Sequence, residues 1–216
     1  MAERELHNIV VEGPIGVGKT SLARRLADSF GGETLLEAAE ENPFLARFYD
    51  NPRQAALPTQ LFFLLQRTRQ MESLMQEDMF RPLRVADFIL DKDRLFAELI
   101  LDEDEFALYE QVYHQLAPEA PAPDLVIYLQ APVEVLLKRI QSRGNPYERG
   151  IETAFLQRLV DAYTRFFHDY ADSPLLIVNA SGIDPINREE DYRILLQQIR
   201  GARTGRHYFN PQPTFL

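Results

Sequence analysis

The sequence of 216 residues predicts an α/β fold, in which one domain contains a five-stranded parallel sheet with helices on both faces. Three observations support this prediction. Short aliphatic runs alternate along the chain with longer segments of helical periodicity, a pattern typical of parallel strands joined by helices. A glycine-rich loop joins the first run to the first helix. The composition, 45% hydrophobic and 26% charged, is that of a folded chain, and its length suits a single core.

The five expected strands are apolar runs at residues 7–12, 34–37, 82–87, 125–129 and 175–179. Between them, the periodicity predicts helices at residues 19–30, 55–78, 95–101 with 105–116, 132–143, 152–170 and 189–200. These elements give a core of about residues 7–200, followed by a C-terminal tail.

The tail, residues 201–216, contains glycine, proline and aromatic residues without helical periodicity. Two interpretations remain open: a frayed end, or a segment that docks on a partner subunit. We favour docking, because Tyr208, Phe209 and Phe215 are unfavourable to expose to water.

Composition excludes several classes of function. The net charge of −10 disfavours binding to nucleic acid, which relies on a basic face. Without cysteine the chain has no disulfides or zinc–thiolate sites, and its four histidines lack metal-ligand spacing. No run of about 18 apolar residues occurs, and the first residues do not resemble a secretory signal. We therefore expect a cytoplasmic protein that binds neither membrane nor nucleic acid.

The strongest motif satisfies the pattern G-x-x-x-x-G-K-[ST] directly after a predicted strand, which is the context of a phosphate-binding P-loop. Its backbone N–H groups and the following helix N-terminus favour phosphate oxygens, the lysine adds a charge, and the threonine hydroxyl is a ligand for Mg²⁺. A glycine-rich turn without a ligand would not explain the Lys-Thr pair. The motif therefore predicts an ATP site formed by Gly13, Pro14, Ile15, Gly16, Val17, Gly18, Lys19 and Thr20.

A P-loop alone does not distinguish GTPases, motor ATPases and small-molecule kinases. The guanine-reading motif Asn-Lys-x-Asp is absent, and residues 85–87 lack the long apolar run of typical ATPase strands. A kinase for a small molecule fits best, with Asp87 as a second candidate ligand for Mg²⁺.

Two further features suit a kinase. Glu37 ends the second predicted strand, at the edge of the sheet where ligands of such folds bind. Arg139, Arg143 and Arg149 lie in or near a polar loop that resembles a lid over phosphates. The alternative is that these cations only stabilise the C-terminus of the preceding helix.

With these residues, the chain resembles the deoxynucleoside kinase family over about residues 7–180. The landmarks are the P-loop and the arginine lid, together with Glu37, Tyr49, Gln60, Arg67, Asp87, Asp93 and Glu148. The resemblance implies a P-loop kinase fold, a homodimer, and transfer of phosphate from ATP to the 5′-hydroxyl of a deoxynucleoside in nucleotide salvage.

The resemblance also implies roles for these residues. Glu37 is the expected base facing the 5′-hydroxyl, and Tyr49 and Glu148 are expected to hold the 3′-hydroxyl. Gln60 is expected to form paired hydrogen bonds with the base. Arg67 and Asp93 add base contacts that favour purines or cytosine. Lys19, Arg139 and Arg143 are expected to stabilise the transferring phosphoryl group.

One departure from the family concerns the end of the third strand. There the family has an acid-Arg-Ser triplet, whereas this chain has Asp87-Phe88-Ile89, so a cation near the 5′-hydroxyl is missing. Arg84 and Arg94 are candidate substitutes. Asn145 also stands where many members have another lid arginine.

Two alternatives therefore remain open. One is a P-loop kinase for a nucleoside monophosphate or another small metabolite. The other is a nucleotide-binding regulatory module that has lost kinase activity.

Overall fold

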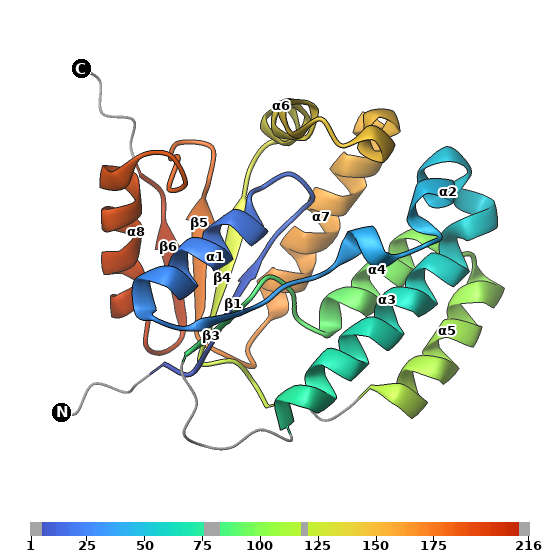
Figure 1. The fold of residues 1–216 in the computed structure, drawn as a ribbon, viewed down its shortest axis with the longest axis horizontal. Helices are drawn as coiled ribbons and strands as arrows, with labels where there is room; N and C mark the ends of the chain where they lie inside the picture. Colours follow the sequence, from blue (N-terminus) through green and yellow to red (C-terminus); the bar gives the residue numbers. More distant parts are fainter. Residues whose placement is uncertain (1–5, 76–82, 118–120, 212–216) are drawn as a thin grey trace.

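The computed structural model describes residues 6–75, 83–117 and 121–211. Six parallel strands form one sheet in the order β2-β3-β1-β4-β5-β6 (Figure 1). Their bounds are β1 Asn8–Glu12, β2 Glu33–Leu35, β3 Arg84–Ala86, β4 Leu125–Gln130, β5 Leu175–Asn179 and β6 Arg206–Phe209. The prediction of a parallel α/β sheet is confirmed, with one strand more than expected.

Helices cover both faces of this sheet, as predicted. They are α1 Lys19–Phe30, α2 Leu45–Asp50, α3 Pro52–Met75, α4 Asp91–Ile100, α5 Glu103–Leu116, α6 Val133–Arg143, α7 Thr153–Asp169 and α8 Glu189–Gly201, with short 3₁₀ turns η1 Ala39–Glu41 and η2 Pro146–Gly150.

The hydrophobic core is divided by the sheet because successive side chains of a strand point to opposite faces. On β1, Ile9 and Val11 belong to the cluster that contains the apolar sides of α1 and α8. Val10 belongs to the cluster on the other face, with residues of α7 and α4. Beyond this face, α3 and α5 pack on α4 around Leu64 and Tyr109, to the right of the sheet in Figure 1.

The C-terminal tail contains a strand that the sequence did not predict. Residues 206–209 are not frayed, because they form β6 and pair in parallel with β5. Gly205, with φ of 68°, turns the chain into this strand. Phe209 packs against the core, whereas Tyr208 is 69% exposed. Phe215 lies outside the described residues.

Two helices begin earlier than predicted, and a third was not predicted. α4 begins at Asp91 instead of residue 95. The prediction missed its first turn because the buried charged residues Lys92 and Asp93 interrupt the apolar period. α3 begins at Pro52, three residues earlier than expected. α2 was missed, since six residues are too few to show a period.

The parallel strands bring their carboxyl ends to one edge of the sheet. The P-loop follows β1 there, Glu37 lies two residues beyond β2, and Asp87 directly follows β3. This edge is the expected place for a ligand in an open α/β sheet.

Candidate active site

The P-loop has the backbone geometry that its glycines predict. Gly13, Gly16 and Gly18 have φ of 147°, 84° and 105°, which other residues rarely adopt. A Cβ on Gly13 would lie 2.4 Å from the carbonyl oxygen of Leu129, and one on Gly16 would lie 2.7 Å from Cγ1 of Ile140. The loop is therefore packed closely against β4 and α6, with its backbone held in one conformation.

Lys19 is folded back on the loop that precedes it. Its Nζ donates hydrogen bonds to the carbonyl oxygens of Gly13 at 2.8 Å and Pro14 at 3.3 Å. Burial and the nearby charge of Lys92 lower the pKa of Lys19 to about 8. A phosphate is the partner that would restore a full charge on this amine.

Thr20 and Asp87 are joined across the site. The Thr20 hydroxyl donates a hydrogen bond of 2.5 Å to Oδ2 of Asp87, and the other carboxylate oxygen accepts a bond of 2.7 Å from the backbone N–H of Glu37. One hydroxyl and one carboxylate fit Mg²⁺, which is commonly held by few protein oxygens plus phosphate. Among the described residues, no group of three or more His, Asp or Glu side chains is arranged to hold a metal by itself.

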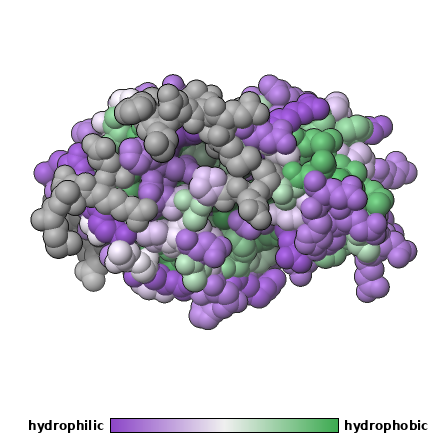
Figure 2. Space-filling view, turned by 90° about the horizontal axis from the view of Figure 1, so that it is seen from below, coloured by the Kyte–Doolittle hydropathy of each residue, from purple (hydrophilic) through white to green (hydrophobic). Residues whose placement is uncertain are grey.

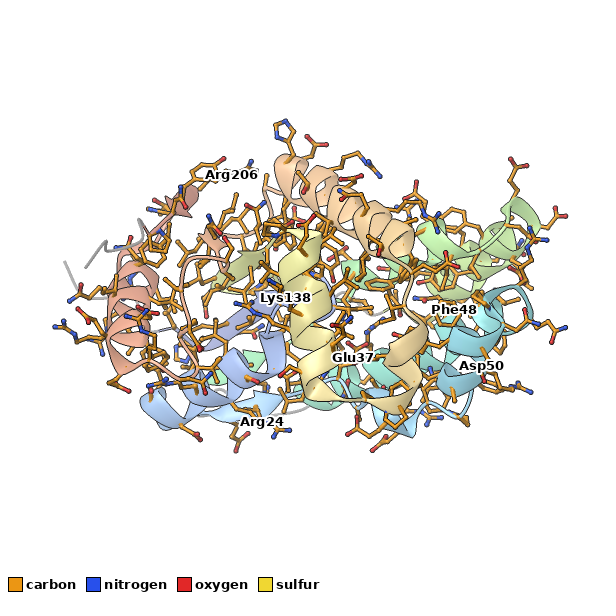
Figure 3. All side chains as sticks on the ribbon, turned by 90° about the horizontal axis from the view of Figure 1, so that it is seen from above. Arg24, Glu37, Phe48, Asp50, Lys138 and Arg206 are labelled. Atoms are coloured by element: carbon orange, nitrogen blue, oxygen red, sulfur yellow. The ribbon has the colours of Figure 1, made fainter. Side chains whose placement is uncertain are left out.

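Glu37 lies in the middle of the molecule, between α1 and α2 in the view from above (Figure 3). Arg67 bonds to one of its carboxylate oxygens, and Lys92 Nζ lies 2.7 Å from the other. Burial alone would raise the pKa of Glu37, but the charges of Arg67 and Lys92 outweigh burial and hold it well below its usual range. Glu37 is therefore ionised and fixed in position.

Five of the six residues predicted to bind the substrate line one cavity of about 520 Å³, which we call the acceptor cavity. Glu37 and the P-loop lysine close one end, α3 contributes one wall, and α2 and the lid contribute the other. Tyr49 stacks on Tyr147 of the lid with ring centroids 6.1 Å apart. The predicted substrate-binding residues on its wall are Glu37, Tyr49, Gln60, Arg67 and Glu148.

Asp93 is placed differently from the prediction. It is fully buried behind the wall, where it accepts hydrogen bonds from the amide nitrogen of Gln60 and pairs with Arg67 at 2.7 Å. Burial raises the pKa of Asp93 to about 6, a rise that Arg67 limits. Since Asp93 occupies the amide nitrogen of Gln60, the Gln60 carbonyl oxygen is the atom available to a base. The amide nitrogen of Gln60 would have to leave Asp93 before Gln60 could form the expected pair of hydrogen bonds with a base.

Residues 143–150, the lid, contain a charge pair. Arg143 donates to both carboxylate oxygens of Glu148 at 2.7 Å. Arg143 lines the acceptor cavity and also a second cavity of about 710 Å³ on the other side of the P-loop, the donor cavity. Arg139 lines the donor cavity and bonds to the carbonyl oxygens of Val17 and Ala180, which braces the P-loop against the end of β5. The side chain of Arg149 lies outside the described part of the lid.

The candidate substitutes for the missing family arginine are both wrong. Arg84 lies at the start of β3, 3.8 Å from Glu33, and Arg94 pairs with Glu110 at the surface. Phe88 is completely buried, and the guanidinium of Arg67 lies over its ring, 5.9 Å from the centroid. Besides Arg67, the cation beside Glu37 is Lys92, which sequence analysis missed. Its rarity was the available signal, because the chain contains only three lysines.

Glu12, the last residue of β1, is a second residue that sequence analysis missed. Its buried carboxylate accepts hydrogen bonds from the backbone N–H groups of Gly13 and Ile89 and from the hydroxyl of Tyr163, at 2.9, 3.0 and 3.1 Å. It ties the P-loop to the segment after β3 and to α7.

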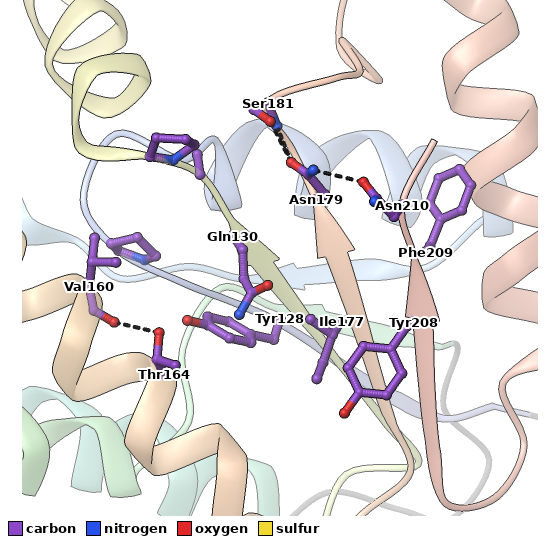
Figure 4. A pocket seen from close by; sticks show the side chains of 13 residues that line it. Tyr128, Gln130, Val160, Thr164, Ile177, Asn179, Ser181, Tyr208, Phe209 and Asn210 are labelled. Carbon is purple, nitrogen blue, oxygen red and sulfur yellow. Dashed lines mark hydrogen bonds between the residues drawn. The ribbon is translucent and has the colours of Figure 1, made fainter. Parts of the chain in front are cut away.

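A third cavity, of about 480 Å³, lies beside β4, β5 and β6 (Figure 4). Gln130, Asn179 and Tyr208 line it, and Asn179 bonds to Asn210. None of the described residues on its wall is charged, and Pro14 is the one predicted site residue among them. We place no chemistry here.

None of the helices within the described ranges combines the length and the apolar character needed to cross a membrane.

Comparison with known proteins identifies the family. The family model described as deoxynucleoside kinase matches residues 9–202. The deoxyguanosine kinase of Bacillus subtilis (strain 168) is 38% identical over 156 residues, 72% of this chain and 75% of that protein. The deoxyguanosine kinase of Lactobacillus johnsonii is 31% identical over 205 residues, 88% of this chain and 90% of that protein.

The fold has a counterpart among solved structures. Deoxyadenosine kinase from M. mycoides, with the products dCMP and a flexible dCDP bound, superposes with a TM-score of 0.79 at 21% identity, over 90% of this chain and 99% of that one. The chain belongs to the deoxynucleoside kinase family and is a phosphotransferase that acts on a hydroxyl group.

Proposed function

We propose that this protein transfers the γ-phosphate of ATP to the 5′-hydroxyl of a purine deoxynucleoside or deoxycytidine in nucleotide salvage, with deoxyguanosine as the first candidate. The acceptor cavity carries the proposal: an ionised Glu37 stands beside the P-loop at one end, and Gln60 and Arg67 form the other part of its wall. The two relatives named deoxyguanosine kinases support guanine as the base.

The base end of the cavity has unsatisfied polar atoms. Within the described residues, Nε of Arg67 and the hydroxyl of Thr59, two residues of the cavity wall, are buried without a hydrogen-bond partner. Such atoms are costly to leave unpaired, so a polar base is favoured there. A guanidinium donates to the O6 and N7 acceptors of guanine, and the Gln60 carbonyl suits the N–H donors of the same base.

The sugar is proposed to lie between the two acidic groups. Glu37 accepts a hydrogen bond from the 5′-hydroxyl, and Glu148 with Tyr49 holds the 3′-hydroxyl. Phosphoryl transfer passes through a loose transition state, so orienting the hydroxyl matters more than removing its proton early. An ionised and fixed carboxylate such as Glu37 suits this task.

The donor is proposed to lie across the P-loop, with its nucleoside in the donor cavity. Lys19 exchanges its bonds to the loop carbonyls for phosphate oxygens, and Arg143 reaches the phosphates from between the two cavities. Thr20 and Asp87 would hold Mg²⁺, which neutralises charge on the β- and γ-phosphates when it is bound.

A nucleoside monophosphate fits this cavity less well. Its phosphate would need a cation with free hydrogen-bonding capacity and no adjacent acid. Arg67, the chief candidate, is already paired with Glu37 and Asp93. We therefore retain a nucleoside as the acceptor.

The homodimer implied by the resemblance stays a proposal, as does the cytoplasmic location. Hydrophobic side chains gather on the side of the molecule that carries α3 and α5 (Figure 2). On these helices Leu65 and Leu108 are 41% and 48% exposed, which supports this side as the dimer contact.

The direct test is a coupled assay with ATP and Mg²⁺ that offers each of the four common deoxynucleosides separately. We expect turnover with deoxyguanosine and slower turnover with thymidine. Absence of turnover with all four would refute the proposed function.

A further inference from the structure

Lysine is rare in this chain and is concentrated at the active site. Of 23 lysine and arginine residues only three are lysines, Lys19, Lys92 and Lys138. Lys138 is exposed on α6, whereas Lys19 and Lys92 both line the acceptor cavity. Two of the three lysines thus face the same reaction space.

Lys92 is held in a defined position. It lies in the first turn of α4, five residues after Asp87, and its side chain is 5% exposed. Its Nζ lies 2.7 Å from Oε2 of Glu37 and 5.7 Å from the ring centroid of Phe96. The ammonium has three N–H donors, and the contact with Glu37 uses one of them.

Stability alone does not account for this lysine. A buried ion pair contributes little net stability, because desolvation of the two charges offsets their attraction. Arg67 already neutralises Glu37 through the other carboxylate oxygen. Lys92 is therefore a second buried cation on one carboxylate, and it also faces the P-loop lysine, whose pKa its charge lowers. Such an arrangement suits a site that receives more negative charge.

The environment of Phe88 explains why the cation comes from α4. The guanidinium of Arg67 lies over the rings of both Phe63 and Phe88, 5.1 and 5.9 Å from their centroids. An arginine at position 88 would place a second guanidinium beside Arg67. The Phe88 ring instead makes a favourable cation–π contact with Arg67. The positive charge beside Glu37 is then supplied by Lys92 of α4.

We propose that Lys92 is a catalytic residue that donates a hydrogen bond to the 5′-oxygen of the acceptor, in place of the family arginine that Phe88 replaces. This inference rests on the proposed function. In the step, the bond from O5′ to the γ-phosphorus forms while the bond from that phosphorus to the leaving diphosphate oxygen breaks. The leaving oxygen keeps the electron pair, the hydroxyl proton passes to Glu37, and Lys92 keeps its own proton throughout. Burial opposes the charge of Lys92, but Glu37 and Glu12 raise its pKa, which keeps it protonated.

Substitution of Lys92 tests the proposal in steady-state assays. Lys92→Gln keeps a donor for Glu37 but removes the charge, and we expect kcat to fall about 100-fold with the KM for ATP within about threefold of wild type. Lys92→Arg restores the charge and is expected to recover at least about tenfold of that loss. The matched control Lys138→Gln removes the exposed lysine and leaves kcat unchanged.

Two kinetic outcomes would overturn the proposal. One is a Lys92→Gln variant with kcat within about threefold of wild type. The other is equal loss in Lys92→Gln and Lys92→Arg while both melt at the wild-type temperature, since charge would then not be the property required. Wild-type turnover and its loss in Glu37→Gln are measured first, so a failure of the proposed function is recognised separately.

A second measurement does not depend on the folding of a Lys92 variant. Wild-type protein with ¹³C at the ε-carbon of lysine gives three signals, and Lys138→Gln and Lys19→Gln assign them. We expect deoxyguanosine without ATP to shift the Lys92 signal and leave that of Lys138 in place. An unchanged Lys92 signal, with deoxyguanosine shown by calorimetry to be bound at saturation, would refute the contact.

Discussion

The hydroxyl of Thr20 donates a 2.5 Å hydrogen bond to Asp87, which joins the start of α1 to the end of β3. Asp87 also accepts a hydrogen bond from the backbone N–H of Glu37. One carboxylate therefore positions both Thr20, a proposed metal ligand, and Glu37, the proposed base. The phosphate-binding and hydroxyl-activating parts of the site are therefore mechanically connected.

Asp87→Asn is expected to raise the Mg²⁺ concentration required for half-maximal rate and to lower kcat about 100-fold, because a neutral amide is a weaker ligand for a hard cation. Initial rates at a series of Mg²⁺ concentrations measure both effects. Asp161→Asn, at an exposed acid of α7, is the control. An Asp87→Asn variant with the wild-type Mg²⁺ dependence would remove Asp87 from the metal site.

Glu148 is expected to recognise the 3′-hydroxyl. Wild-type protein should prefer deoxyguanosine over 2′,3′-dideoxyguanosine by about tenfold or more in kcat/KM, the value of a hydrogen bond to a charged group. In Glu148→Gln this preference should shrink to about threefold or less, mainly through slower turnover of the natural substrate. The ratio of kcat/KM values for the two nucleosides, measured in each protein, gives the result. Equal ratios in the two proteins would place the 3′-hydroxyl elsewhere.

Gly16→Ala is expected to lower both stability and ATP affinity. The new Cβ would lie 2.7 Å from Cγ1 of Ile140, at a backbone φ of 84° that disfavours alanine. The expected loss in the free energy of unfolding is about 1–3 kcal/mol. Urea unfolding and ATP calorimetry measure the two quantities. Gly201→Ala is the matched control, since nothing lies within 4 Å of its Cβ and no positive φ is required there. Equal stability of the two variants would contradict the packing described for the loop.

Asp93 is expected to make stability depend on pH. Burial raises the pKa of Asp93 to about 6. The titratable and charged groups that face it are Arg67 of α3, Glu37 after β2, Lys92 of α4 and Tyr109 of α5. An exposed aspartate has a pKa of about 3.9. Between about pH 4 and 6 the folded protein therefore binds more protons than the unfolded chain, and the contribution of Asp93 to the free energy of unfolding falls as pH rises.

Asp93→Asn removes this titration while keeping the shape of the side chain. Urea unfolding at several pH values should show the wild-type free energy of unfolding falling relative to that of the variant up to about pH 6 and running parallel above about pH 7. A difference that stays constant from pH 4 to 7 would show that Asp93 does not titrate in this window.

The sequence predicted the parts of the fold that follow simple periods. β1, β4 and β5 are buried aliphatic runs, and the P-loop is defined by glycines whose conformations the structure bears out. β6 was missed because its residues are only partly buried, and its pairing with β5 is a long-range contact. No local pattern encodes such a contact.

At the site, the predicted residues that line the acceptor cavity were found through the family landmarks. Lys92 was not found, because a single lysine between two aspartates resembles a solvated helix turn. Lys92 is buried because it pairs with Glu37, which is 55 residues away in the sequence, and only the folded structure shows this contact. Asp93 was placed on the wall by analogy, but its bonds to Gln60 and Arg67 hold it one layer deeper.

The ionised carboxylate of Glu37 is proposed to act on the acceptor hydroxyl, and Glu37→Gln removes this carboxylate while keeping the shape of the side chain. The measurement is kcat with deoxyguanosine, together with the Kd of ATP by calorimetry, beside the control Glu33→Gln at an exposed acid of β2. The predicted result is a fall in kcat of about 100-fold or more in Glu37→Gln alone, with the Kd of ATP within about threefold of wild type. A Glu37→Gln variant that turns over at the rate of wild type would show that Glu37 does not act on the hydroxyl.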